Sequence, residues 1–210
     1  MKLLLLCLAV FGASSAQFSP EGTSMILNGH NDFRSTIAMG WFTANGVQQP
    51  SATDMNKLIW ADVLASEAQD YSSSCPSDYS GVDNRGEAMY YAWSTDNVDN
   101  LDGFGLDALN DWEQEFNNFG LSSLLYDQAA SQSGIRDGVQ MAFSTTTSVG
   151  CGVTNCGPDP DRFDQANKII VVCRYGIQED QIGLNIYEAG DTCSNCNNFL
   201  MCDNGSGLCA

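Results

Sequence analysis

The chain has 210 residues, with 26 acidic and 8 basic side chains and a formal net charge of −18. This charge argues against nucleic acids and anionic membrane surfaces as partners, because both are negatively charged and would be repelled. The length is enough for one domain with a hydrophobic core, and the acidity is typical of a well-dispersed secreted protein.

The N-terminus has the pattern of a secretory signal peptide. Lys2 supplies one positive charge, an apolar run extends from Leu3 to Phe11, and small residues lead to Ala16. The run is too short to cross a bilayer, so we predict cleavage after Ala16 and an extracellular protein without a transmembrane segment. Cleavage removes Cys7, one of nine cysteines, and the even number that remains predicts disulfides.

Helical periodicity predicts a first helix between Ser24 and Met39. Ser24 is a candidate N-cap, and Gly40 can adopt the left-handed conformation that ends a helix. Two further helices are predicted, one running toward Cys75 and one ending at Gly120. Their apolar positions are Trp60, Leu64, Ala68 and Tyr71, and then Leu109, Trp112, Phe116 and Phe119.

The stretch from Arg136 to Val153 is predicted to hold a central strand. Its first half alternates apolar with smaller or polar residues, a period of two that predicts a strand with one face on the core. The alternating apolar residues are Val139, Met141 and Phe143. Further on, two glycines flank Cys151 and allow close approach of another backbone, so Cys151 is a candidate for a disulfide.

The run from Ile169 to Tyr175 is apolar and β-branched without alternation. Such a run predicts a strand that is buried on both faces. Helices are therefore expected to cover the sheet on either side.

The C-terminal tail is different in kind, because its small and polar residues cannot form a core. Four cysteines there predict a small segment held by disulfides: Cys193, Cys196, Cys202 and Cys209. A four-cysteine zinc site is the alternative, and it suits an oxidising compartment less well. Asn204 begins a glycosylation sequon.

Several short motifs occur in a characteristic order between Leu27 and Gly176. They are His30-Asn31-x-x-Arg34, Trp60-x-x-x-Leu64-Ala65-x-x-Ala68, Gly86-Glu87, Trp112-x-x-Glu115, Gln140-Met141-Ala142-Phe143, Gly150-Cys151-Gly152-Val153 and Val172-Cys173-Arg174-Tyr175-Gly176. In this order they resemble the CAP superfamily (SCP/TAPS) of secreted proteins. Within it, the chain is most similar to the nematode ancylostoma-secreted, activation-associated or venom-allergen-like proteins.

The resemblance implies an α+β fold, a three-layer α-β-α sandwich with a short antiparallel sheet. This CAP domain would span residues 17–190, after a signal peptide at 1–16 and before a cysteine-rich, hinge-like tail at 191–210. The same resemblance implies four disulfides, Cys75–Cys151, Cys156–Cys173, Cys193–Cys202 and Cys196–Cys209.

Many members of that superfamily carry a cleft in which two histidines and two glutamates hold a divalent metal. The glutamates match Glu87 and Glu115, whereas Tyr79 and Asp137 stand where the resemblance places the histidines. The chain has a single histidine, His30, for which we predict a structural role in the core. A two-histidine zinc site cannot be built from it.

Glu87, Glu115 and Asp137 would then converge, with Tyr79 at the rim. Three neighbouring carboxylates repel one another, so they would share a proton, bind calcium or magnesium, or pair with Arg85 or Arg136. In the simpler alternative, one glutamate only hydrogen-bonds backbone across the cleft.

The function predicted first is that of a non-enzymatic secreted protein that binds a host protein or receptor, with immunomodulation as one such role. The alternative is an extracellular carrier of a sterol or fatty acid, with apolar candidates that are more often core residues: Met89, Tyr90, Tyr91, Phe104 and Leu106. A metal-dependent hydrolase is disfavoured by the histidine count, and no serine or cysteine lies in a triad context. The resemblance also leaves a homodimer open.

Overall fold

The structure is a computed structural model that describes residues 17–210 except 82–84, 97, 163, 177–180 and 198–199. The predicted signal peptide lies outside the described residues. The helices in chain order are α1 (Pro20–Ala38), α2 (Asp62–Ser73), α3 (Asp102–Phe119), α4 (Gln128–Ser131) and α5 (Arg136–Ala142). No helix in the described ranges is both long and apolar enough to span a membrane.

One four-stranded sheet, in the order β3-β6-β7-β4, lies at the centre of the fold. Its strands are β3 (Ile59–Trp60), β4 (Gly86–Ser94), β6 (Ser148–Pro158) and β7 (Asn167–Tyr175). The β6–β7 and β7–β4 pairs are antiparallel, and the short β3 pairs with β6 in parallel. Three two-stranded pairs are peripheral: β1 (Thr43–Ala44) with β2 (Val47–Gln48), β5 (Leu125–Tyr126) with β8 (Leu184–Asn185), and β9 (Cys202–Asp203) with β10 (Leu208–Cys209).

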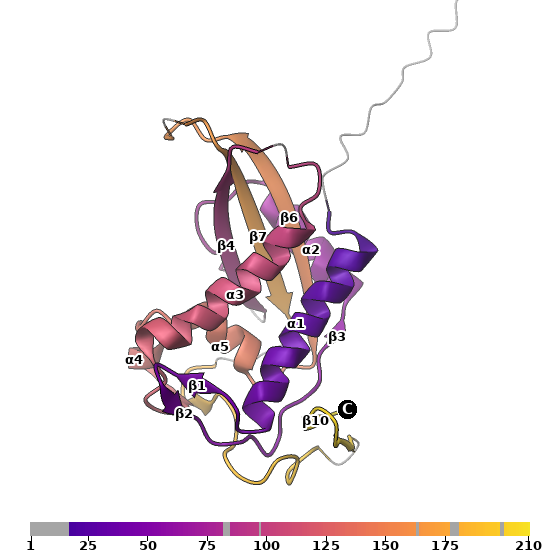
Figure 1. The fold of residues 1–210 in the computed structure, drawn as a ribbon, viewed down its shortest axis with the longest axis vertical. Helices are drawn as coiled ribbons and strands as arrows, with labels where there is room; N and C mark the ends of the chain where they lie inside the picture. The colour runs from indigo at the N-terminus through magenta and orange to yellow at the C-terminus, as the bar shows by residue number, and fades with distance from the viewer. Residues whose placement is uncertain (1–16, 82–84, 97, 163, 177–180, 198–199) are drawn as a thin grey trace, which may run out of the picture.

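Helices cover both faces of the sheet (Figure 1). The α2 helix packs on β6 and β7 from behind, while α1, α3 and α5 pack together on the other face. Residues Ile169 to Tyr175 of β7 are all buried, as their apolar run predicts. This arrangement confirms the predicted three-layer α-β-α sandwich, with one parallel strand pair added to its antiparallel sheet.

The first helix begins earlier than the sequence predicts. Its N-cap is Ser19, whose hydroxyl accepts a hydrogen bond from the Gly22 N–H at 3.0 Å, and Pro20 occupies the first turn. Ser24 instead donates to the Pro20 carbonyl from within the helix. The predicted end is correct, since Gly40 follows with φ +68°.

The second and third helices are confirmed, but two of the predicted apolar positions differ. Trp60 lies in strand β3, before α2 begins at Asp62. Leu109, Trp112 and Phe116 are buried, whereas Phe119 is 58% exposed at the end of α3. Gly120 ends the helix with φ +78°.

The strand predicted for Val139 to Phe143 is wrong, because residues Arg136–Ala142 form the short helix α5. Every residue from Asp137 to Ser144 is buried. Alternation of apolar and polar residues distinguishes a strand only when one face meets water, and here both faces are packed. The central strand of the predicted stretch is β6, which begins at Ser148.

The glycines around Cys151 have the role predicted from the sequence. A Cβ at Gly150 would lie 2.2 Å from the backbone nitrogen of Ala65, and one at Gly152 would lie 2.4 Å from the backbone of Gln69. The α2 backbone therefore approaches β6 at distances that only glycine allows. The Gln69 amide fixes this contact by bonding both the N–H and the C=O of Val153.

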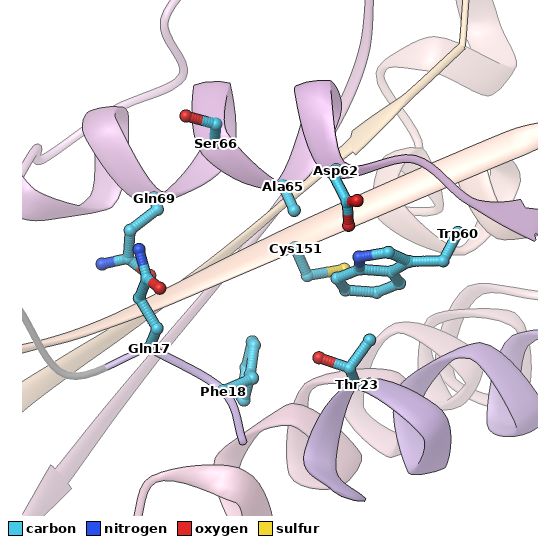
Figure 2. A pocket seen from close by; sticks show the side chains of 9 residues that line it. All are labelled: Gln17, Phe18, Thr23, Trp60, Asp62, Ala65, Ser66, Gln69 and Cys151. Atoms are coloured by element: carbon cyan, nitrogen blue, oxygen red, sulfur yellow. The ribbon is translucent and has the colours of Figure 1, made fainter. Parts of the chain in front are cut away.

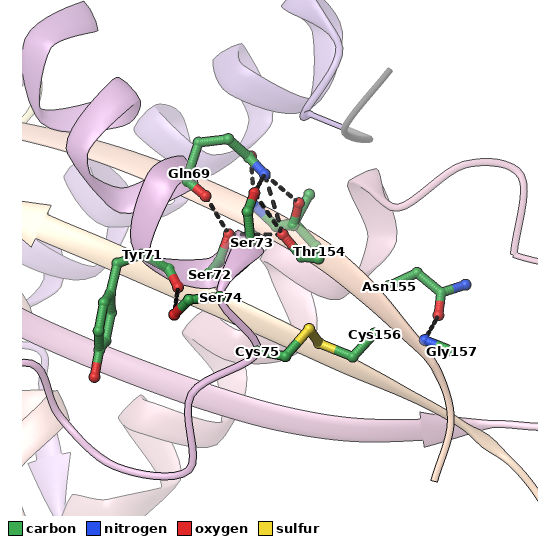
Figure 3. Close-up of a disulfide and its surroundings, with 11 residues drawn as sticks. Gln69, Tyr71, Ser72, Ser73, Ser74, Cys75, Thr154, Asn155, Cys156 and Gly157 are labelled. Atoms are coloured by element: carbon green, nitrogen blue, oxygen red, sulfur yellow. Dashed lines mark hydrogen bonds between the residues drawn. A yellow bond between two sulfur atoms is a disulfide. The ribbon is translucent and has the colours of Figure 1, made fainter. Parts of the chain in front are cut away.

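Two of the four disulfides predicted from the resemblance are wrong. Cys151 and Cys173 are bonded to each other, because they stand directly opposite in the β6–β7 register with their Cα atoms 4.1 Å apart. Cys75, after α2, is bonded to Cys156 near the end of β6 (Figure 3). Ser72 and Thr154 form a hydrogen bond at 2.8 Å beside this bridge.

The two bridges predicted for the tail, Cys193–Cys202 and Cys196–Cys209, are confirmed. Backbone hydrogen bonds from Cys209 to Met55 and from Lys57 to Cys209 hold the tail against the rest of the domain. Asn204 is exposed in the turn between β9 and β10. Its glycosylation stays a prediction.

Candidate functional site

The four predicted cleft residues come from four separate segments that the fold brings to one edge of the sheet. Tyr79 follows α2, Glu87 lies in β4, Glu115 lies in α3, and Asp137 lies in α5. The α5 helix packs on both α3 and β4, which carries Asp137 toward the two glutamates.

Tyr79 and Asp137 are directly bonded. The Tyr79 hydroxyl donates to Oδ2 of Asp137 at 2.8 Å, and the guanidinium of Arg136 stacks 3.5 Å from the centre of the Tyr79 ring. Burial and the nearby Asp137 raise the pKa of Tyr79, so the tyrosine stays a neutral donor.

Asp137 is only 6% exposed, and its other carboxylate oxygen, Oδ1, has no hydrogen-bond partner among the described residues. Burial therefore raises its pKa from the ordinary 3.8 to about 7, although the bond from Tyr79 and the charge of Arg136 oppose the shift. The carboxyl group is thus poised to take up a proton near neutral pH.

Glu115 accepts a hydrogen bond at 2.8 Å from the backbone N–H of Gly138, in the first turn of α5. A carboxylate at this place satisfies one of the free N–H groups at the start of a helix. Burial raises its pKa to about 8; the Gly138 bond lowers it, and the charge of Asp137 raises it further. A charged Asp137 therefore disfavours the ionisation of Glu115.

Glu87 is held by a cation that the sequence did not assign to it. Its carboxylate accepts bonds from the N–H and hydroxyl of Ser80 at 2.7 and 2.8 Å, and it pairs with the Arg174 guanidinium at 3.0 Å. The predicted cations are used elsewhere, since Arg85 pairs with Glu67 and Arg136 lies over Tyr79. Glu115 bonds the backbone N–H of Gly138, as the simpler alternative predicts for one glutamate, whereas Glu87 also pairs with Arg174.

The single histidine is a core residue, as predicted. His30 is fully buried, with Nδ1 2.9 Å from the Ile26 carbonyl and Nε2 2.9 Å from the Tyr175 hydroxyl. A carbonyl only accepts, so Nδ1 carries the proton and Nε2 accepts from Tyr175. Burial lowers the pKa of His30 to about 4, which keeps the ring neutral.

Asn31 and Arg34, the rest of the His30 motif, are also structural. The Asn31 side chain bonds both the N–H and the C=O of Leu58. Arg34 is fully buried and donates to five backbone carbonyls: Asn56, Met141, Phe143, Ser144 and Thr146. Burial lowers the pKa of Arg34 to about 9.

The spacing of the possible ligand atoms indicates which side chains could share a metal ion. Among the described residues, one group of three or more His, Cys, Asp or Glu side chains is close enough to share an ion, namely Cys193, Cys196 and Cys209. Their sulfurs are committed to disulfides. In this structure Glu87, Glu115 and Asp137 are not such a group.

The raised pKa values of Asp137 and Glu115 indicate that the cleft can bind protons near neutral pH. Carboxyl groups with pKa values near neutrality are common at catalytic sites, and buried hydrogen-bonded networks also produce them. A general base acts on a nucleophile or water within hydrogen-bond reach. Asp137 instead bonds Tyr79, whose raised pKa keeps it protonated.

Comparison with known proteins agrees with this fold. A model of the cysteine-rich secretory protein family, CAP, matches residues 27–175. The chain belongs to the CAP family. It is 31% identical over 180 residues to a CRISP/Allergen/PR-1 protein of Trittame loki, an alignment that covers 82% of this chain and 42% of the relative.

Other CAP relatives come from nematodes. An Ancylostoma secreted protein of Ancylostoma caninum is 29% identical over 209 residues, which cover 92% of this chain and 47% of that protein. The chain thus spans less than half the length of these two relatives.

Solved CAP structures superpose closely. BmVAL-1 has a TM-score of 0.81 at 26% identity, covering 95% of this chain and 98% of that one. NaASP2, solved with Zn²⁺, has a TM-score of 0.80 at 26% identity, covering 92% and 97%.

Two residues that complete this CAP cleft were missed at the sequence level. Arg174 stands opposite Glu87 in the β4–β7 register, and Ser80 is the other partner of Glu87. Arg174 carried a readable signal, because a single arginine inside a buried apolar strand requires an acceptor. No comparable signal marked Ser80, because the sequence of a loop does not reveal where its side chains point.

Proposed function

We propose that this CAP protein is a secreted, non-enzymatic binding protein in which Tyr79 and Asp137 take the places of the metal-binding histidines. One observation carries the proposal: the cleft side chains bond one another and nearby backbone, while the only histidine lies in the core. A cleft with this internal bonding leaves no paired base and nucleophile to perform hydrolysis.

Partner binding at a host interface is the role that this proposal favours. The relatives named as an Ancylostoma secreted protein and as venom allergens support secretion, and four disulfides are consistent with an oxidising, extracellular location. Modulation of host immunity and homodimer formation stay predictions within this role.

Restoring the two histidines tests the cleft. Zinc binding is measured by isothermal titration calorimetry on the wild-type chain and on the double variant Tyr79→His, Asp137→His. We expect no zinc binding in the wild type and stoichiometric binding in the variant, because two imidazoles beside Glu87 and Glu115 would complete a nitrogen and oxygen ligand set.

Calcium and magnesium are titrated into the wild type in the same way, and a single variant, Tyr79→His, is the matched control for an incomplete ligand set. Stoichiometric binding of any of these ions to the wild type, removed by Glu115→Gln, would overturn the proposed role. Hydrolytic activity that Asp137→Asn abolishes would do the same.

Lipid carriage is a second candidate, favoured by a hollow of about 240 Å³ at the end of α3. Its apolar lining includes the exposed Phe119 and Leu125, together with Leu121, Ala130 and Ile135. The lipid-binding candidates chosen from the sequence are less suited, since Met89 is buried and Tyr90, Phe104 and Leu106 pack against the core.

Native mass spectrometry after incubation with palmitate or cholesterol tests this candidate. A lipid adduct that is lost in Phe119→Ser would support carriage at this hollow. The control is Val63→Ser, which removes an equally exposed apolar side chain from α2. An unchanged mass with both lipids would exclude carriage of either.

A further inference from the structure

A second hollow, of about 270 Å³, lies on the opposite edge of the sheet from the cleft, beyond β3 (Figure 2). The residues before α1 and the first turn of α1 form one wall, and α2 forms the other. Cys151 of β6 lies between these walls. Trp60 and Asp62 lie at one end of the hollow, and Gln17 and Gln69 lie at the other.

Polar groups around this hollow have no partner among the described residues. They are the indole N–H of Trp60, the carboxylate of Asp62 and the hydroxyls of Thr23 and Ser66. Phe18 and the Trp60 ring supply apolar surface beside them. Apolar walls with a few convergent polar groups are the general character of small-molecule sites.

The edge of β6 adds backbone groups to the same hollow. The Val149 carbonyl accepts from the Ala61 N–H, and Val153 bonds the Gln69 amide through both backbone groups, so alternate residues of β6 face this edge. By this alternation the N–H and C=O of Cys151 face it too. Within the described residues they have no partner there.

Among the described residues that line the hollow, Asp62 has the only charged side chain, and none of them is a lysine, arginine or histidine. A cation is therefore the complementary charge, and the strongly acidic chain favours its approach. The lining residues of α2 are Asp62, Ala65, Ser66 and Gln69. They form one side of the helix, so a ligand would lie along α2 and not at its positive N-terminal end.

We propose that this hollow binds a small aromatic amine, with its ammonium group on the Asp62 carboxylate and its ring between Phe18 and Trp60. The face of the Trp60 indole attracts the ammonium group of the ligand and also packs against the ligand's aromatic ring. A single ring with a two-carbon ammonium arm fits the available volume of about 270 Å³. The site goes beyond the proposed binding function and is separate from the cleft.

Three probes of matched shape test the proposal: phenethylamine, 2-phenylethanol and phenylacetate, which differ in charge at the end of the arm. Isothermal titration uses the full chain as secreted by a eukaryotic expression host. We expect phenethylamine to bind at least about tenfold more tightly than the alcohol, and phenylacetate not to bind, because a hydrogen bond to a charged group contributes enough for this ratio.

Asp62→Asn should reduce phenethylamine affinity by about tenfold or more and leave 2-phenylethanol unchanged. The control is Asp70→Asn, which removes an exposed carboxylate from the same helix outside the hollow. Equal binding of the three probes, no binding of the amine, or unchanged affinity in Asp62→Asn would overturn the proposal. Competition by palmitate in place of the amine would also overturn it. The zinc titration of the cleft is independent of every one of these outcomes.

Discussion

The cleft and the hollow beyond β3 lie on opposite edges of one sheet and use their polar side chains in opposite ways. In the cleft, Glu87 and Glu115 are bonded to Arg174, Ser80 and the first turn of α5. Around the hollow, the polar side-chain groups of Trp60 and Asp62 have no hydrogen-bond partner within the described residues. Buried polar groups that bond one another stabilise a fold, whereas exposed unpaired groups are available to a ligand.

An acidic residue in the sequence therefore does not have the same role at both edges of the sheet. Glu87 and Glu115 match motifs of a binding cleft and act here as structural acceptors. Asp62 belongs to no motif and faces an open hollow. The difference predicts that changes in the cleft alter stability and that changes at the hollow alter binding.

The largest expected loss of stability is that caused by Arg174→Met. It leaves the Glu87 carboxylate, which is 6% exposed, without its counter-ion. Removing one partner of a buried ion pair costs about 3 to 5 kcal/mol of unfolding free energy. For a chain of this length that lowers the melting temperature by about 10 °C or more, which calorimetry measures.

Arg162→Met is the matched control, because Arg162 pairs with Asp164 while both side chains are nearly half exposed. An exposed pair contributes about 0 to 1 kcal/mol, so its melting temperature should barely change. Equal losses in the two variants would contradict the structural role assigned to the cleft.

Arg174 also marks the extent to which the site could be predicted from the sequence. The ordered motifs predicted the sandwich and the four cleft positions, and the β-branched run from Ile169 to Tyr175 predicted the buried β7. Partners across the sheet depend on register, which spacing along one strand does not reveal. Arg174 was therefore missed, and Cys151 was assigned to Cys75 instead of Cys173, its cross-strand neighbour.

The α5 helix shows a different limit. Its alternating pattern predicted a strand, but burial on all sides made the polar positions uninformative. The hollow beyond β3 escaped prediction because its residues come from four segments, none of which has a motif for ligand binding.

A smaller effect is expected from pH. Asp137 and Glu115 have folded pKa values of about 7 and about 8, above their ordinary 3.8 and 4.5, chiefly through burial. The folded state thus binds more protons than the unfolded state between about pH 4 and 8. Stability is greatest below this window and is lost as the pH rises through the folded pKa values.

Asp137→Asn removes the Asp137 part of this titration, leaves that of Glu115, and keeps an oxygen to accept from Tyr79. Urea denaturation should give a flatter pH dependence, with the variant more stable than the wild type by about 2 kcal/mol at pH 8 and similar to it near pH 4.5. Asp107→Asn, an exposed change on α3, is the control. Parallel pH profiles for Asp137→Asn and the wild type would show that burial does not disfavour the Asp137 charge.

The smallest effect on stability is expected from Asp62→Asn, and it is the sharpest test of the contrast between the two edges. Asp62 is exposed and bonds no described residue, so its substitution should change the unfolding free energy by less than about 0.5 kcal/mol in urea. The same variant should lose most of its affinity for phenethylamine. Loss of stability together with affinity would mean that Asp62 holds α2 in place, and the hollow would then resemble the cleft. Loss of affinity alone would show that Asp62 contributes to ligand binding, whereas the cleft residues contribute to stability.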